Sequence, residues 1–305
     1  HLGVRRQRQM CIRDSLKEGQ TLLLENLRFH KGEETNNKDF SEDLTLGIDY
    51  FVNDAFSCSH RKHSSTVGVT NFLPSFMGTH LEKEIKALEG VLNNPNKPVA
   101  AIIGGSKVST KIDVINFLLK KMDIIIIGGA MANTFVSAKG LDVGKSLFEK
   151  ECIDLAKELI EKSQNNNCNL ILPTDFIVSK NLKKNAEYTT ANFDSLPHNM
   201  MALDIGPKSI ELINKNINNC KTILWNGPLG AFETYPFDKG TNKVASHVSS
   251  LTKQKKILSV AGGGDTVSAL NNAKVLNDFS YVSTAGGAFL EWLEGKVLPG
   301  IEPIS

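Results

Sequence analysis

The stretch Leu258–Leu270 (LSVAGGGDTVSAL) joins an apolar run to three glycines, an acidic residue and a second apolar segment with helical spacing. This order is typical of a buried strand, a tight turn and the first turns of a helix. Glycines let the backbone approach a ligand closely, and the unpaired N–H groups at the start of a helix attract phosphate. The stretch therefore indicates an anion-binding turn at the end of a strand.

Asp265 complicates this interpretation, because its negative charge would repel an anion at the start of the helix. One hypothesis is that Asp265 is simply the N-cap, a position that favours Asp. The other is that a cation lies between its carboxylate and the phosphates. The local sequence is compatible with both.

The same order of strand, turn and helix recurs from residue 96 onward. Apolar strands, each followed by a turn rich in glycine or in Pro, Asn and Asp, are predicted at residues 99–103, 124–127, 170–172, 222–225, 257–261 and 281–283. Apolar strands that alternate with helices indicate an α/β fold with a doubly wound parallel sheet. Because ligands bind outside the carboxyl ends of such strands, we expect the glycine turns to converge on one surface.

The N-terminal part of the chain is less regular. Short strands are predicted at Thr21–Asn26 and Tyr50–Asn53, helical spacing runs over Asp39–Leu46, and an amphipathic helix is predicted at Leu81–Leu92. The Asn/Pro-rich residues 93–98 that follow predict a boundary between two domains. A length of 305 residues accommodates both.

The composition narrows the class of protein. Lys+Arg 35 and Asp+Glu 33 leave a formal net charge of +2, which argues against a nucleic-acid partner and against a membrane-surface partner. No apolar run in the sequence reaches the length of a membrane span. The five scattered cysteines argue against a disulfide framework and favour the reducing cytoplasm.

Arginine is unevenly distributed. It is concentrated in residues 4–15 (VRRQRQMCIRDS), a segment whose composition looks foreign to the rest of the chain. After residue 13 only Arg28 and Arg61 occur, and lysine supplies the remaining positive charge. These two arginines therefore indicate places where a planar, bidentate fork binds an anion that lysine would bind less well.

Three further residues are candidates for ligand binding. Lys107 and Lys111 lie four apart at the predicted start of a helix, where two cations oppose the helix dipole unless they share an anion. Two solvated lysines are the alternative. Glu233 ends the turn-rich stretch 225–233 (WNGPLGAFE), and its carboxylate is either a surface group or an acceptor for a hydroxyl such as that of a ribose.

Other site types fit less well. Gly140–Ser146 resembles a phosphate loop but lacks its glycine spacing, and no G-x-G-x-x-G follows a strand as a nicotinamide-dependent dehydrogenase requires. Cys58, His60 and His63 suggest zinc, but no fourth ligand has suitable spacing.

Over about residues 16–305 the chain resembles the phosphoglycerate kinase family. The matching stretches include LLLENLRFHKGEE (22–34), HRKHSS (60–65), GGSKVSTKIDV (104–114), WNGPLGAFE (225–233), GGGDT (262–266) and STAGGAFLEWLEGKVLPGI (283–301). The resemblance implies two Rossmann-like, doubly wound parallel-sheet lobes joined by a helix. It places a 3-phosphoglycerate-binding lobe in residues 1–80, the joining helix and boundary in 81–95, a nucleotide-binding lobe in 96–290, and a segment returning to the first lobe in 291–305.

The resemblance also implies an activity: transfer of a phosphoryl group between ATP or ADP and 3-phosphoglycerate or 1,3-bisphosphoglycerate, a step of glycolysis. It implies Mg²⁺ carried on the nucleotide, a monomer, and a cytoplasmic location. The attacking group is a carboxylate, so no general base is needed and catalysis rests on positioning and charge neutralisation.

Residue roles follow from the same resemblance. Arg28 and Arg61, together with His1, would bind the glycerate. The catalytic residues that it implies are Lys107, Lys111, Gly286 and Gly287. The nucleotide-binding residues that it implies are Lys111, Asn226, Glu233, Gly262, Gly263, Gly264, Asp265 and Thr266. Among these, Asn226 and Glu233 would hold the nucleoside side and Asp265 would carry Mg²⁺.

The sequence departs from the family pattern in two places. The family's first strand, with its Asp-x-Asn motif and a following Arg, is absent, and only His1-Leu2-Gly3 remains of the motif S-H-L-G-R-P. We therefore expect an N-terminally incomplete glycerate lobe, in either an active kinase or a nucleotide-binding fragment without turnover. Ala285 replaces a family glycine, and we expect strain there if the position requires a positive φ.

Overall fold

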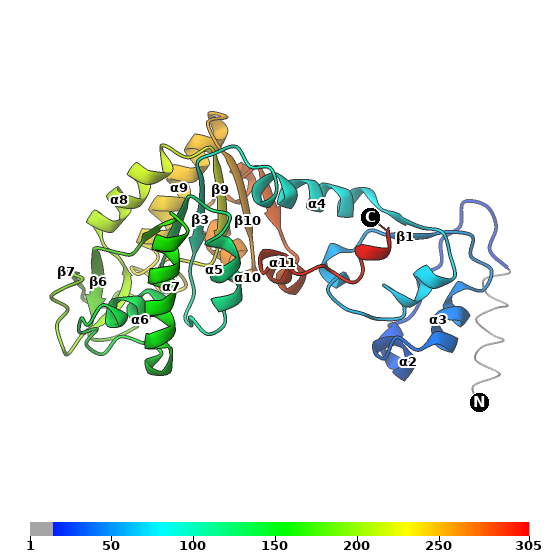
Figure 1. The fold of residues 1–305 in the computed structure, drawn as a ribbon, viewed down its shortest axis with the longest axis horizontal. Helices are drawn as coiled ribbons and strands as arrows, with labels where there is room; N and C mark the ends of the chain where they lie inside the picture. The colour runs from blue at the N-terminus through cyan, green and yellow to red at the C-terminus, as the bar shows by residue number, and fades with distance from the viewer. Residues whose placement is uncertain (1–14, 305) are drawn as a thin grey trace. The chain divides into compact units, whose positions relative to one another are not determined.

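The computed structural model describes residues 15–304 and divides them into two units (Figure 1). The first unit runs to Glu84 and takes in the C-terminal residues from Val297. The second comprises Ile85–Lys296. The last residues of the chain thus belong to the same unit as its N-terminal part.

The second unit is built on a parallel six-stranded sheet. Its strands are β3 (Val99–Ile103), β4 (Ile124–Ile127), β5 (Asn169–Ile171), β9 (Thr222–Asn226), β10 (Leu258–Gly262) and β11 (Tyr281–Ser283). Across the sheet they follow the order β11-β10-β9-β3-β4-β5. The chain thus builds outward from β3 on one side and from β9 on the other, which is the doubly wound arrangement that the sequence predicted.

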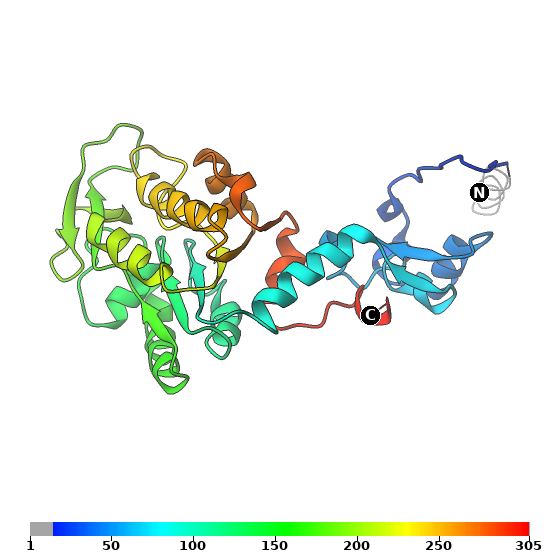
Figure 2. The ribbon, with the colours of Figure 1, turned by 90° about the horizontal axis from the view of Figure 1, so that it is seen from above.

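Helices cover both faces of this sheet (Figures 1 and 2). The helices of the second unit are α5 (Ile112–Leu118), α6 (Met131–Ala138), α7 (Ile153–Asn165), α8 (Pro207–Ile217), α9 (Lys239–Lys253), α10 (Gly264–Asn272) and α11 (Gly286–Leu293), with 3-10 turns η4 (Lys150–Cys152) and η5 (Leu276–Asp278). Alternate strand residues such as Ile102 and Trp225 are fully buried against the apolar faces of α8, α9 and α10. No helix within residues 15–304 combines the length and apolar character needed to cross a membrane.

A small antiparallel sheet, which the sequence did not predict, lies in the same unit. It consists of β6 (Asp175–Ser179), β7 (Thr189–Asn192) and β8 (Met201–Ile205), in the order β7-β6-β8. Phe176 and Val178 of β6 and Ala202 of β8 form a second buried cluster with Val136 of α6. This sheet provides a second wall beside the edge of the parallel sheet.

The first unit has little regular structure. Its elements are η1 (Leu27–Phe29), α2 (Lys31–Glu34), α3 (Lys38–Thr45), β1 (Phe51–Asn53), η2 (Phe56–Cys58), η3 (Gly68–Asn71), β2 (Ser75–Met77) and η6 (Glu302–Ile304). The predicted strand at Thr21–Asn26 is wrong: these residues are exposed and irregular. Within residues 15–304 no strand pairs with them, so their apolar side chains have no sheet to pack into.

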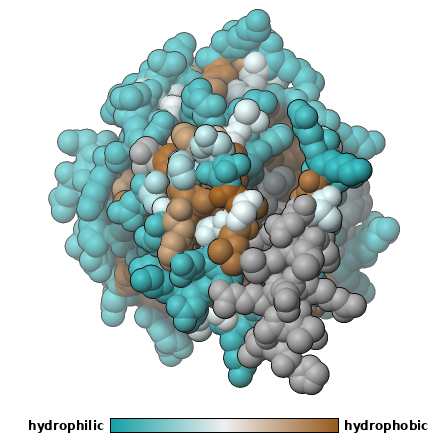
Figure 3. All heavy atoms as spheres, turned by 90° about the vertical axis from the view of Figure 1, so that its right-hand side faces the viewer, coloured by the Kyte–Doolittle hydropathy of each residue, from teal (hydrophilic) through white to brown (hydrophobic). Residues whose placement is uncertain are grey.

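The two strands of this unit pair in parallel and expose an apolar face. Val52 of β1 lies opposite Phe76 of β2, and their side chains are 56% and 52% exposed. The ring of Tyr50 lies 6.0 Å from that of Phe76. Figure 3 shows hydrophobic side chains (brown) on the surface of one face of the molecule.

Helix α4 (Thr79–Leu92) begins in the first unit, and its start is held by a side chain. Asp54 Oδ1 accepts hydrogen bonds from the backbone N–H groups of His80 (2.7 Å) and Leu81 (2.9 Å). The C-terminal residues are tied to the same unit, because Asn53 Nδ2 donates to the carbonyl oxygen of Gly300 at 2.9 Å. These contacts fix the start of α4 and the C-terminal residues within the first unit.

Candidate active site

The glycine turns after β3, β4 and β9 meet at one edge of the parallel sheet. A Cβ at Gly104 would overlap the carbonyl oxygen of Pro228, and one at Gly129 would lie 2.5 Å from the carbonyl oxygen of Gly105. Only glycine permits such close approach of backbones. The strand order reverses between β3 and β9, so this edge is the switch point at which doubly wound sheets bind ligands. The predicted convergence of these turns is confirmed.

The turn after β10 contributes to the same edge. Gly263, with a φ of 96°, is the N-cap of α10, and a left-handed backbone at this point favours glycine. Asp265 lies in the first helical turn and is exposed. The hypothesis that Asp265 is the N-cap is therefore wrong, and its carboxylate is not occupied in capping this helix.

A lysine joins three elements at this edge. Lys111 Nζ donates a short hydrogen bond of 2.5 Å to Asn226 Oδ1, and Asn226 Nδ2 donates to the carbonyl oxygen of Gly262 at 2.7 Å. Burial lowers the pKa of Lys111, against the opposing charges of Asp265 and Glu294. The ammonium group is thus partly desolvated at a place where a bound anion would stabilise its charge.

Lys107 lies elsewhere than the sequence predicted. Helix α5 begins at Ile112, with Lys111 as its N-cap residue, so the two lysines do not share a helical face and that prediction is wrong. Residues 108–111 form a turn instead, closed by a hydrogen bond of 2.8 Å from the backbone N–H of Lys111 to the carbonyl oxygen of Val108. Lys107 is exposed in the loop before this turn.

Glu149, which the sequence analysis missed, holds the loop that carries Lys107. Its carboxylate accepts hydrogen bonds from the backbone N–H (3.0 Å) and the hydroxyl (2.6 Å) of Ser109. Desolvation would raise the pKa of Glu149, but the bonds from Ser109 and the charge of Lys107 outweigh it and lower that pKa. No local pattern identifies such a contact, because forty residues separate its partners.

A cavity of about 340 Å³ lies against this edge of the sheet. Its polar residues include Glu233 and Asp265, both exposed, and its apolar residues include Leu147, Phe176 and Leu203. Backbone from the glycine turns forms one side, and residues of β6 and β8 form the other. A flat apolar group with a charged, hydroxylated end fits these surroundings.

Thr266 is buried and already engaged. Its hydroxyl oxygen accepts a hydrogen bond of 2.7 Å from the backbone N–H of Gly227, so it fixes the turn after β9. Thr266 therefore stabilises the turn after β9, which forms part of the site.

The start of α11 lies beside the end of β10. Gly286 and Gly287 open this helix and are exposed, and the ring of Phe289 packs directly on Gly262. Ala285 has a φ of −91°, which any residue adopts, so the strain expected there does not occur. The backbone N–H groups of both glycines are thus near the β10 turn.

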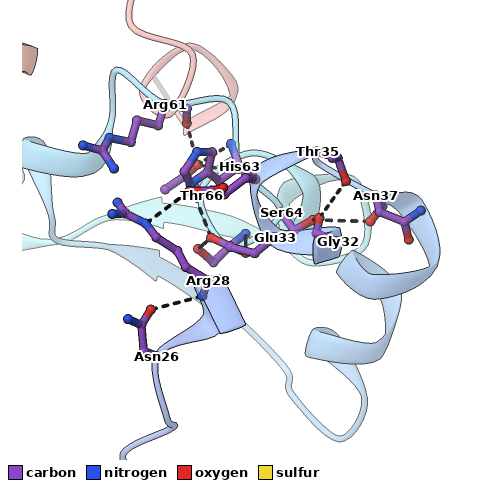
Figure 4. A network of polar contacts seen from close by, with 12 residues as sticks. Asn26, Arg28, Gly32, Glu33, Thr35, Asn37, Arg61, His63, Ser64 and Thr66 are labelled. Carbon is purple, nitrogen blue, oxygen red and sulfur yellow. Dashed lines mark hydrogen bonds and ion pairs between the residues drawn. The ribbon is translucent and has the colours of Figure 1, made fainter. Parts of the chain in front are cut away.

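In the first unit, Arg28 and Arg61 extend to the same side of a polar network (Figure 4). Arg28 Nε lies 4.0 Å from Glu34 Oε1, and its side chain is 45% exposed. Arg61 Nε donates to His60 Nε2 at 3.3 Å. Both guanidinium groups keep donors for a ligand. His1, the third predicted glycerate ligand, and nearly all of residues 4–15 lie outside the described residues.

Glu33 organises this network and was also missed by the sequence analysis. It is 3% exposed, and its carboxylate accepts hydrogen bonds from the backbone N–H (3.1 Å) and the hydroxyl (2.5 Å) of Ser65. His63 Nδ1 lies 3.6 Å from the same carboxylate (Figure 4). Helix α2 is thereby tied to the loop that carries Arg61.

Metal-ligating side chains are sparse at the edge of the parallel sheet and in the polar network around Arg28 and Arg61. Within residues 15–304 no group of three or more His, Cys, Asp or Glu side chains is arranged to hold a metal ion. The zinc hypothesis for Cys58, His60 and His63 has no support there. Asp204, Glu233 and Asp265 supply the carboxylates that line the cavity, and Asp265 is the one in the first turn of α10. One carboxylate at that place fits a metal ion held mainly by the oxygens of a ligand.

Comparison with known proteins points to one family. A family model described as phosphoglycerate kinase matches residues 5–296. Curated phosphoglycerate kinases of Brucella melitensis and Rhizobium meliloti are 53% and 52% identical, over 95% and 94% of this chain and 73% and 72% of their own lengths. The chain thus spans about three quarters of the length of these relatives.

Solved structures of two phosphoglycerate kinases also resemble this chain. The phosphoglycerate kinase structure from Coxiella burnetii matches with a TM-score of 0.90 and 43% identity, over 95% of this chain and 74% of that one. The structure from Pyrococcus horikoshii OT3 matches with a TM-score of 0.79 and 30% identity, over 96% and 75%.

Proposed function

The chain belongs to the phosphoglycerate kinase family, and we propose that it moves a phosphoryl group between ATP or ADP and 3-phosphoglycerate or 1,3-bisphosphoglycerate. The observation that carries the proposal beyond family membership is the Lys111–Asn226 bond at the switch point of the parallel sheet. It holds a partly buried cation where a phosphate chain would end.

The nucleotide occupies the cavity beside this edge. Its base lies against the apolar residues Leu147, Phe176 and Leu203, and Glu233 accepts a hydrogen bond from a ribose hydroxyl. The phosphates lie toward the turn after β10, where the first N–H groups of α10 are available to an anion. Lys107, which is exposed on its loop, adds positive charge from the other side.

Lys111 stabilises the negative charge that develops on the transferred phosphoryl group. Because burial has already lowered its pKa, approach of the phosphates restores a favourable environment for the ammonium ion. The N–H group of Gly287 supplies a further donor to the same charge, whereas that of Gly286 donates to the carbonyl oxygen of Thr284 at 3.2 Å in this structure. Asn226 was expected on the nucleoside side, but both polar atoms of its side chain are bonded within the protein, so it is a positioning residue for Lys111.

The acceptor binds through the arginines of the first unit. Arg28 and Arg61 supply bidentate donors for the phosphate and carboxylate of 3-phosphoglycerate. Glu33 fixes the loop before Ser65 and so the position of Arg61. The attacking carboxylate needs no deprotonation at neutral pH, so the residues of the chain have to position and neutralise rather than move protons.

Mg²⁺ accompanies the nucleotide, and Asp265 is the residue that would hold it. When bound, the ion neutralises charge on the phosphate oxygens. One carboxylate at the start of α10 suits Mg²⁺, which keeps several waters and takes most of its other ligands from phosphates. Action as a monomer in the cytoplasm stays a prediction from the family.

A coupled assay with 3-phosphoglycerate and MgATP, run beside calorimetric titration with ATP, tests the proposal. The proposal predicts both turnover and nucleotide binding. ATP binding without turnover would contradict phosphoryl transfer and favour a nucleotide-binding protein without activity. Absence of ATP binding would contradict both functions.

A further inference from the structure

Asn133 of α6 is a buried amide with one unsatisfied polar atom. The residue is 1% exposed, and its Nδ2 donates to the carbonyl oxygen of Leu147 at 3.0 Å. Its Oδ1 is also buried, and no hydrogen-bond donor among the described residues reaches it. Buried acceptors without a partner are rare and costly, so this atom indicates a missing donor.

The orientation of the amide follows from chemistry. The carbonyl oxygen of Leu147 can only accept, so the atom that faces it is the Nδ2 group and the unsatisfied atom is the oxygen. Asn133 and Leu147 both line the cavity described above. A ligand in that cavity is therefore the natural source of the missing donor.

We infer that Asn133 recognises the base of the nucleotide by accepting a hydrogen bond from its exocyclic amino group, an inference that rests on the proposed function. In the proposed function the phosphates lie toward Lys111 and the turn after β10, and Lys111 is not among the residues that line the cavity with Asn133. Leu147 and Phe176, which line the same cavity as Asn133, are apolar and suit an aromatic ring. A donor on the edge of that ring is what a buried amide oxygen can read, and the 6-amino group of adenine is such a donor.

Discrimination by this bond can be measured on the unmodified protein. Calorimetry would compare MgADP with the diphosphate of purine riboside, in which hydrogen replaces the 6-amino group. One net hydrogen bond to a buried acceptor predicts that ADP binds roughly threefold to tenfold more tightly. Because no residue is changed, this result does not depend on the folding of a variant.

A variant then assigns the discrimination to Asn133. In Asn133→Leu, ADP should bind no more tightly than the purine riboside analogue, while the affinity for the analogue stays within about twofold of its original value. Asn216→Leu is the matched control, since Asn216 also donates its Nδ2 to a leucine carbonyl oxygen (that of Leu212, at 2.8 Å) but lies outside the cavity. It should retain the full preference for ADP.

The outcomes separate this inference from the function on which it rests. Equal affinity of the unmodified protein for both nucleotides would overturn the role of Asn133 and leave the kinase proposal standing. An equal loss of both affinities in Asn133→Leu would show a purely structural role and would also overturn the inference. Failure of the unmodified protein to bind ADP at all would overturn the proposed function, and the inference with it.

Discussion

Lys111 Nζ donates to Asn226 Oδ1 at 2.5 Å, across the point where the strand order of the parallel sheet reverses. The bond connects the residue before α5 with Asn226, the last residue of β9. Asn226 in turn donates its Nδ2 to the carbonyl oxygen of Gly262 at the end of β10. Three elements from distant parts of the sequence therefore determine the direction of one ammonium group. Such preorganisation is what charge stabilisation in phosphoryl transfer requires.

Asp265→Asn tests the proposed link between this carboxylate and Mg²⁺. We expect the affinity for MgADP to fall roughly tenfold, whereas the affinity for metal-free ADP should stay the same or rise, because a charge that repels phosphate is removed. Calorimetry with and without Mg²⁺ checks this. Asp113→Asn, in the first turn of α5, is a suitable control. Equal effects on both forms of the nucleotide would refute the metal role.

Arg61→Lys keeps the charge but removes the planar fork. If Arg61 binds the glycerate in a bidentate manner, KM for 3-phosphoglycerate should rise about tenfold, while KM for ATP stays unchanged. Steady-state kinetics with each substrate varied in turn gives both values. The neighbouring Lys62→Arg serves as the control. An unchanged KM for 3-phosphoglycerate would show that the geometry of the fork does not matter.

Glu33→Gln tests the hydrogen bonds that hold the loop of Arg61. Loss of an ideal acceptor for the Ser65 hydroxyl and N–H should lower the free energy of unfolding by about 1–3 kcal/mol. It should also raise KM for 3-phosphoglycerate but not KM for ATP, because Glu33 acts through Arg61 and not on the nucleotide. Thermal unfolding and kinetics are the measurements, with the exposed Glu42→Gln as control. A loss of stability without any change in KM would leave Glu33 a purely structural residue.

Asp204 predicts a pH dependence of stability. Burial raises its pKa to about 8, although the backbone N–H groups of Gly240 (2.6 Å) and Ile205 (2.9 Å) favour its charged form. Its pKa in the unfolded chain is about 3.9. The folded state therefore binds more protons between these two values, and this group makes the free energy of unfolding fall as the pH rises from about 4 to 8.

Asp204→Asn removes that dependence. Relative to the unmodified protein, the variant should gain stability steadily between pH 5 and about pH 8 and level off above it, as urea unfolding at several pH values would show. The exposed Asp194→Asn should show no such trend. A difference between Asp204→Asn and the unmodified protein that stays constant with pH would contradict the raised pKa.

Local patterns in the sequence were sufficient to predict the parallel sheet. Strands such as Ile124–Ile127 are continuous apolar runs that end at glycines, and both features depend only on neighbouring residues. The strand predicted at Thr21–Asn26 has the same apolar character, but a strand also needs a partner, and no partner lies within the described residues. The antiparallel sheet was missed because β7 (TTAN) buries only one side chain.

The site could be predicted only in part, for a related reason. Lys111 and Glu233 stand in turns, and Asp265 in the first helical turn after one, that the sequence marks with glycine or proline, so their convergence followed from the sheet. Asn133 and Glu33 stand in helices and look like ordinary surface residues in the sequence. Their burial and their bonds depend on contacts that form only in the folded chain.

The central claim is that Lys111 neutralises the transferred phosphoryl group, and Lys111→Met tests it most directly. The variant keeps the length of the side chain and removes its charge. With 3-phosphoglycerate and MgATP at saturating concentrations, we predict that kcat falls on the order of 100-fold to 1,000-fold, while the exposed Lys120→Met leaves it unchanged. A kcat within about twofold of the unmodified value would contradict the account.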